Sequence, residues 1–175
     1  MTIQRITWPA CRAHWESLGT DGDFQFSYAP GMVTGDYVSV EASSGGSCGG
    51  AHPDGSEWHI TFDRQTGRKV DLFGWFTRAG FVPSSPGDAG TIRQITPALR
   101  RLVASRFHFD QDECREPVET ADFWDISIDH GGMIFQPSLP HVVAACSDGV
   151  VVPFAVLNPY LSPSGKQGAA RLAGR

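Results

Sequence analysis

Short segments in which apolar side chains alternate with polar ones constrain the fold of this chain more than any other feature. Residues 24–28, 37–42, 58–62 and 124–128 each place aromatic or aliphatic side chains at every second position. A period of two is typical of half-buried β-strands. Residues that favour turns separate several of these segments, so the pattern predicts a mainly antiparallel, twisted sheet.

One segment, residues 96–107, has a helical pattern instead. Thr96 is a favoured N-cap residue, and Pro97 is favoured at the first helical position. The side chains expected to be buried are Leu99, Leu102, Val103 and Phe107, and those expected to face solvent are Arg100, Arg101 and Arg106. We therefore expect an α+β fold in which this principal helix packs on one face of the sheet.

Length and composition favour a single domain. A chain of 175 residues with 41% hydrophobic residues can bury a substantial core. We expect this domain over residues 1–161, with a short helix at 8–18 and with Pro153 in an edge or terminal strand. Residues 162–175 are polar and rich in glycine and alanine, which predicts a frayed C-terminal tail.

The cysteines and the charge indicate a compartment and exclude one class of partner. Four cysteines favour two disulfides and an oxidising environment. Of the three possible pairings, the expected strand ends favour Cys114 with Cys146, which leaves Cys11 for Cys48. The net charge of −5 disfavours binding to nucleic acid.

No segment resembles a membrane span or a signal peptide. The sequence lacks an apolar run of about 18 residues, and the opening residues MTIQRITWPAC lack the apolar core of a secretory leader. We therefore expect that an exported form has lost its leader and that Met1 is not its native start.

The stretch SSGGSCGGAHPDG, residues 43–55, has the composition of a functional loop. It lacks the Gly-Lys-Ser/Thr of a phosphate loop and leads into a strand rather than a helix. Zinc ligation by Cys48 and His52 together with His141 and Cys146 is conceivable, but these spacings match no common zinc motif. We expect a turn fixed by a disulfide, with no metal and no cofactor.

The sequence contains no complete catalytic motif. Serines lie close to His52, but no Gly-x-Ser-x-Gly elbow surrounds them. An acid–base hydrolase would need two opposed carboxylates, and the sequence does not pair the available ones. Those available are Glu41, Glu57, Asp63, Asp125 and Asp129. We assign no catalytic residue and consider an enzyme the less favoured alternative.

Two longer stretches are similar to a known family. YVSVEASSGGSCGGAHPDGSEWHITFDRQTGRKVDLFGWF and FWDISIDHGGMIFQPSLPHVVAACSDGVVVPFAVLNPYL resemble the DUF3298-type domain, and the resemblance covers about residues 37–161. It implies an extracytoplasmic α+β domain. Members of the family include the lysozyme-binding region of an anti-sigma factor and an appendage of peptidoglycan deacetylases. Ser138 to His141 depart from the family pattern, which has a tyrosine and an acid after the FxP motif.

The resemblance implies a non-catalytic recognition domain in the periplasm or at the cell surface. The expected partner is an envelope glycan or an envelope protein such as lysozyme, and the expected ligand contacts are His52, Trp58 and His141. The alternative is a small hydrolase that acts on cell-wall material. A deep pocket with converging carboxylates or a Cys/His cluster would favour the hydrolase, whereas a flat face with exposed aromatic side chains would favour binding. The oligomeric state stays open.

Overall fold

The computed structural model describes residue 16 and residues 23–47, 54–85, 93–109 and 112–173. These residues form antiparallel sheets and several short helices, which confirms the expected α+β class. The strands divide into three separate sheets, however, where the sequence predicted one. The helix expected at 8–18 lies, apart from residue 16, outside the described residues.

The first sheet consists of three long strands in the order β1-β2-β3. These are β1 (Asp23–Val33), β2 (Tyr37–Ser47) and β3 (Asp54–Asp63). The glycine-rich stretch extends the strands, because Gly45 pairs with Gly55 across β2 and β3. Residues 43–47, 54 and 55 of the expected loop are therefore strand residues, and residues 48–53, which include Cys48 and His52, lie outside the described residues.

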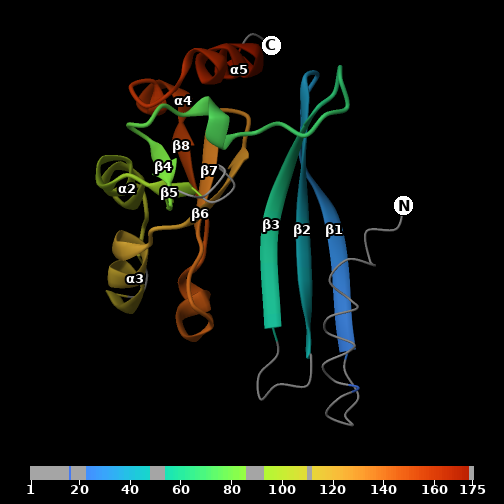
Figure 1. The fold of residues 1–175 in the computed structure, drawn as a ribbon, viewed down its shortest axis with the longest axis vertical. Coiled ribbons are helices and arrows are strands. Elements are labelled where there is room, and N and C mark those ends of the chain that lie inside the picture. The colour runs from blue at the N-terminus through green and yellow to red at the C-terminus, as the bar shows by residue number, and fades with distance from the viewer. Residues whose placement is uncertain (1–15, 17–22, 48–53, 86–92, 110–111, 174–175) are drawn as a thin grey trace.

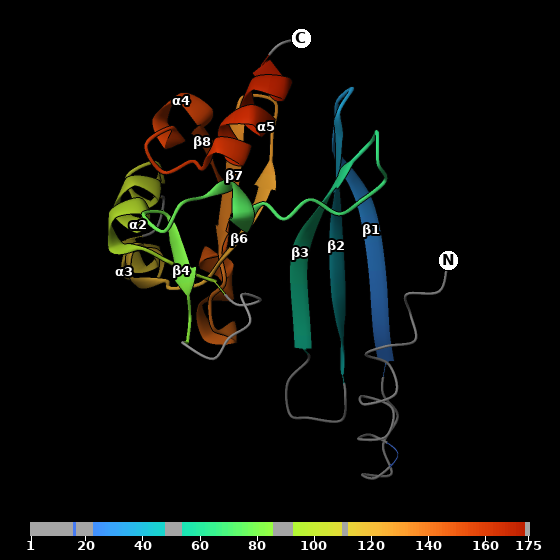
Figure 2. The same ribbon diagram turned by 45° about the horizontal axis from the view of Figure 1, so that its top comes forward.

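The other two sheets and the helices form a second lobe beside the first sheet (Figures 1 and 2). One sheet has the order β6-β7-β8, with β6 (Trp124–Ile128), β7 (Gly132–Pro137) and β8 (Val150–Pro153). The other pairs β4 (Phe81–Pro83) with β5 (Arg93–Ile95). Pro153 lies in an edge strand, as expected.

Short helices cover the second lobe. The α-helices are α2 (Pro97–Ala104), α3 (Arg115–Thr120), α4 (Phe154–Leu157) and α5 (Pro163–Ala173). The 3₁₀ helices are η2 (Phe73–Trp75), η3 (Asp112–Cys114) and η4 (His141–Cys146).

Helix α2 confirms the principal helix and its start. The Thr96 hydroxyl accepts a hydrogen bond from the Leu99 amide at 3.3 Å, as an N-cap residue should. The helix ends at Ala104 rather than at 107. The expectation that Arg100 faces solvent is wrong, because its guanidinium donates to Asp122 at 2.7 Å and to the Thr120 carbonyl at 3.1 Å.

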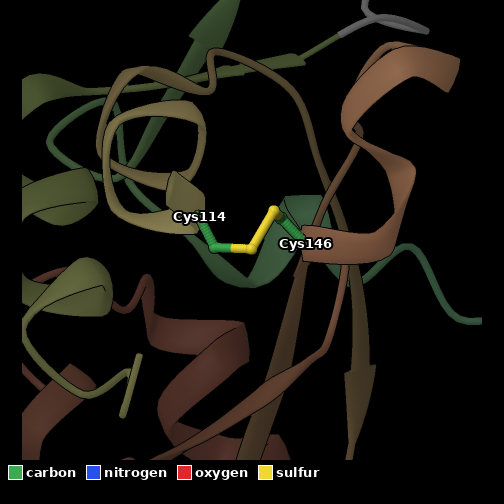
Figure 3. Close-up of a disulfide and its surroundings, with 2 residues drawn as sticks. All are labelled: Cys114 and Cys146. Carbon is green, nitrogen blue, oxygen red and sulfur yellow. A yellow bond between two sulfur atoms is a disulfide. The ribbon is translucent and has the colours of Figure 1, made fainter. Parts of the chain in front are cut away.

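The hydrophobic core lies in the second lobe, between the β6–β8 sheet and the helices. Phe135 is at its centre and contacts Phe76, Phe81 and Trp124. The side chains without exposed surface include Leu99, Val103, Val118, Met133, Phe135, Val152 and Leu157. A disulfide between Cys114 and Cys146, the pairing favoured by the sequence, joins η3 to η4 at the border of this core (Figure 3).

The C-terminal segment is not a frayed tail, because residues 163–173 form helix α5. The Ser162 hydroxyl accepts from the Gly165 amide at 3.2 Å and caps the first turn. Gly165 and Gly168 pack directly on Trp75: a Cβ atom at Gly168 would lie 2.4 Å from the indole ring. Arg171 then bonds Asp63 at 3.1 Å and so connects α5 to the first sheet.

The first sheet turns its polar face toward the second lobe. Ser39 and Thr61 share a hydrogen bond of 3.1 Å and are each only 2% exposed. The side chains that the alternation predicted to be buried, such as Trp58 and Ile60, point to the opposite face and are half-buried. A polar surface therefore lines the junction between the first sheet and the second lobe.

Candidate functional site

The candidate site is a groove at this junction, which we call the inter-sheet groove. Its walls are the polar face of β3 and the face of the β6–β8 sheet that carries Asp125 and Gln136, which are paired across β6 and β7. The largest of three hollows in the groove, of about 660 Å³, includes Glu57 and both of these residues in its lining. Hollows of about 510 Å³ and 380 Å³ adjoin it.

Six residues line two of the hollows each, and three of these six have titratable side chains. Asp125 lines the first and second hollows, Glu57 the first and third, and His59 the second and third. These side chains therefore form the centre of the groove. Trp58 lines the second hollow, and Ser138 and Leu139 line the first.

Asp125 fixes the position of His59. One carboxylate oxygen of Asp125 accepts hydrogen bonds from both the backbone amide and the ring Nδ1 of His59, each at 2.8 Å. The two side chains are 24% and 13% exposed. The Asp125 hydrogen bond raises the pKa of His59 above its usual value of 6.5, although burial opposes the shift.

Glu41 and Glu57 form a second pair beside His59. Glu41 lies directly across from His59 in the β2–β3 pairing, and Glu57 precedes His59 by two residues on the same face. A hydrogen bond from Glu57 to Glu41, followed by partial burial, raises the pKa of Glu57. Glu57 therefore holds its proton more tightly than an isolated glutamate does.

Comparison with known proteins identifies the fold. Neither a scan of protein-family models nor a search of curated proteins gave a match. The similar solved structures include two members of one family. A DUF3298 family member from Bacteroides fragilis aligns at a TM-score of 0.60 and 13% identity, covering 97% of this chain and 67% of that one. A DUF3298 family protein from Pseudomonas aeruginosa aligns at 0.47 and 18% identity, covering 81% and 63%.

The chain has a DUF3298-type fold. The alignment with the Bacteroides fragilis protein supports the resemblance stated from the motifs and extends it to nearly the whole chain. Our chain spans about two thirds of the length of each of these proteins. At such low identity the likeness concerns the fold and carries no residue roles.

Within the DUF3298-type fold, the stretch that departs from the family motif contributes to the groove. Ser138 and Leu139, which follow the FxP motif, both line the largest hollow. The same stretch leads into η4, which ends at the disulfide-bonded Cys146. The stretch that follows β7 therefore contributes to the lining of the groove.

The structure places only one of the three expected ligand contacts. Trp58 lines the groove next to His59. His52 lies outside the described residues, and of His141 only its backbone position at the start of η4 is described. The zinc arrangement that included Cys146 is excluded, because that sulfur is bonded to Cys114.

His59 is the site residue that the sequence interpretation missed, together with its pairing to Asp125. The signal was the sequence Glu57-Trp58-His59, because strand alternation places Glu57 and His59 on one face. Glu57 and Asp125 were considered as carboxylates without a partner. The sequence could not show that Asp125 lies beside His59, because the two residues are 66 positions apart and come together only through tertiary packing.

Proposed function

We propose that this chain is a non-catalytic recognition domain that works outside the cytoplasm and binds a glycan of the cell envelope in the inter-sheet groove. The observation that carries the proposal is the convergence of three adjoining hollows on Glu57, His59 and Asp125. Adjoining hollows with polar groups at their centre suit an extended, hydroxyl-rich chain better than a compact ligand.

The chemistry of the walls supports a glycan. Sugar hydroxyls both donate and accept hydrogen bonds, and the groove offers carboxylates, the Gln136 amide and the Ser138 hydroxyl. Phe73 lines the second hollow and supplies aromatic surface against which the apolar face of a sugar ring can pack. Mixed polar and aromatic linings of this kind are usual for small-molecule and cofactor sites.

The disulfide supports an extracytoplasmic location. Cys114 and Cys146 are 32 residues apart and bonded, and such bonds persist mainly in oxidising compartments. In the described part of the chain, no helix has the length and apolarity needed to cross a bilayer.

A glycan is favoured over a protein ligand such as lysozyme because the binding groups lie in a recess. A stable protein–protein interface needs about 800 Å² on each partner. The groups described here are concentrated at the centre of a groove and do not form a broad apolar face.

The test is calorimetric titration of the protein with soluble peptidoglycan fragments, in parallel with lysozyme. We expect binding of the fragments, weakened at least about tenfold by Gln136→Ala. Glu116→Gln, an exposed acidic residue on α3, is the matched control and should bind as the wild type does. Binding to lysozyme without binding to the fragments would contradict the proposal.

One observation supports the hydrolase alternative. A carboxyl group with a raised pKa, Glu57, lies close to a carboxylate held by a histidine, as the acid and the base of a hydrolase would. Mass spectrometry of the fragments after prolonged incubation separates the two functions. We expect intact fragments; cleavage that is lost in Glu57→Gln would establish the hydrolase instead.

A further inference from the structure

We infer that Glu41, Glu57 and His59 form a binding site for one divalent transition-metal ion, with Zn²⁺ as the best match. This inference goes beyond the glycan proposal and does not depend on it. It concerns the centre of the groove, where the three side chains come from two adjacent strands.

The geometry brings three ligand atoms together. One ring nitrogen of His59 and one carboxylate oxygen from each of Glu41 and Glu57 all lie within 4.8 Å of one another. Zinc bonds of about 2.0–2.2 Å in a tetrahedron separate the ligand atoms by roughly 3.3–3.6 Å. The carboxylates therefore need to move by only about 1 Å, and Glu57 is exposed and can rotate.

Asp125 is not one of the three ligands, but its contact with His59 gives a separate argument for the metal site. Its carboxylate accepts from Nδ1 of His59, which leaves Nε2 as the nitrogen with a lone pair for a metal. The second bond, from the His59 backbone amide to the same oxygen, fixes Asp125 itself. Metal-binding histidines in proteins commonly have such a carboxylate on their other nitrogen.

The ligand set selects the class of ion. One imidazole nitrogen and two carboxylate oxygens suit Zn²⁺, whereas Ca²⁺ takes six to eight oxygen ligands. A dication would also relieve the repulsion between Glu41 and Glu57, which share a hydrogen bond without it. Three protein ligands leave a fourth position open toward the groove, where a water molecule or a ligand hydroxyl can bind.

The test is calorimetric titration of chelator-treated, dialysed protein with Zn²⁺ alone. We expect one site whose affinity falls at least about tenfold in Glu57→Gln, and which is lost in His59→Ala. Asp125→Asn should weaken it by about 10–100-fold, the range for a residue that orients a ligand. The controls are His108→Ala and Glu116→Gln, which change exposed residues outside the groove and should bind as the wild type does.

The visible absorption of bound Co²⁺ gives a second readout, because tetrahedral coordination produces an intense band that should disappear in His59→Ala. Equal Zn²⁺ affinity in the wild type, Glu57→Gln and His59→Ala would overturn the inference. If His59→Ala does not fold, Glu57→Gln, at an exposed position, still decides the question. Fragment binding that persists in chelator, in a protein that does not bind Zn²⁺, would overturn the metal site and leave the glycan proposal intact.

Discussion

The first sheet and the second lobe are stabilised in different ways. The second lobe has a continuous core around Phe135 and a disulfide at its border. The first sheet adds Met32 and Tyr37 to that core. Polar contacts also join it to the second lobe. His59 forms a hydrogen bond with Asp125, and Arg171 forms ion pairs with Asp36 and Asp63.

The difference explains why the candidate site lies at the junction. A surface buried by apolar packing has no polar groups to offer a ligand, whereas a junction built on charged hydrogen bonds keeps carboxylates and imidazole within reach of solvent. Stability should therefore depend mainly on residues of the second lobe, and ligand or metal binding on residues at the junction.

The largest expected effect is in the core of the second lobe. Phe135→Ala removes a side chain with no exposed surface and should lower the free energy of unfolding by about 3–5 kcal/mol. Val142→Ala, at a side chain that is 89% exposed, should change it by less than about 0.5 kcal/mol. Urea titration followed by circular dichroism measures both. Similar values for the two variants would disprove the assignment of the core.

The disulfide should have the next largest effect. Replacing both Cys114 and Cys146 by serine should cost about 2–4 kcal/mol, mainly because the unfolded chain becomes less restricted. The pairing of Cys11 with Cys48 stays a prediction, since both lie outside the described residues. Thiol titration of the denatured, unreduced protein should find no free thiol. Two free thiols would contradict that second pairing.

Local sequence patterns predicted α2, β6 and the strand that contains Pro153, but they did not predict β4, β5, α3, α4 or α5. Thr96-Pro97 correctly marked the start of α2, and Ser162-Pro163 marks the start of α5 in the same way. We expected a tail there because Gly165 and Gly168 indicate flexibility in isolation. Their actual role is to let α5 approach Trp75, and that contact is defined by residues about 90 positions apart.

The candidate site was less predictable than the fold. Alternation in β3 correctly separated two faces, but it did not show that the polar face would be buried as well. Thr61, on the polar face, is 2% exposed, because the second lobe packs against that face. Which face meets a partner depends on the tertiary arrangement, so the sequence favoured Trp58 over its neighbour His59.

A smaller effect is expected where α5 joins the second lobe. Gly168→Ala would place a methyl group 2.4 Å from the Trp75 ring and should cost about 1–3 kcal/mol through overpacking. At Gly131 no atom lies within 4 Å of the added carbon, so Gly131→Ala is the control and should be nearly neutral. Thermal unfolding measures both. A stabilised Gly168→Ala would show that α5 does not pack closely on Trp75.

The smallest expected effect is the contribution of the junction to the pH dependence of the free energy of unfolding. It is measured in the presence of a chelator, so that metal binding does not contribute. The pKa of His59 is raised above 6.5, chiefly by its hydrogen bond to Asp125, so the folded protein binds this proton more tightly than the unfolded chain does. This contribution to stability is fully present below pH 6.5 and is lost as the pH rises through the raised pKa. Glu57 acts in the same direction from about pH 4.5 upward.

Asp125→Asn should therefore destabilise the protein most near pH 6, and its stability should converge toward that of the wild type as the pH rises above the pKa of His59. Asp122→Asn is the matched control, because it removes the partner of Arg100 in the second lobe and leaves the His59 step unchanged. Urea titrations between pH 5 and pH 9 measure the three curves. A constant difference between wild type and Asp125→Asn over this range would show that protonated His59 does not stabilise the junction. Convergence would show that this contact between the first sheet and the second lobe depends on charge, whereas the core around Phe135 does not.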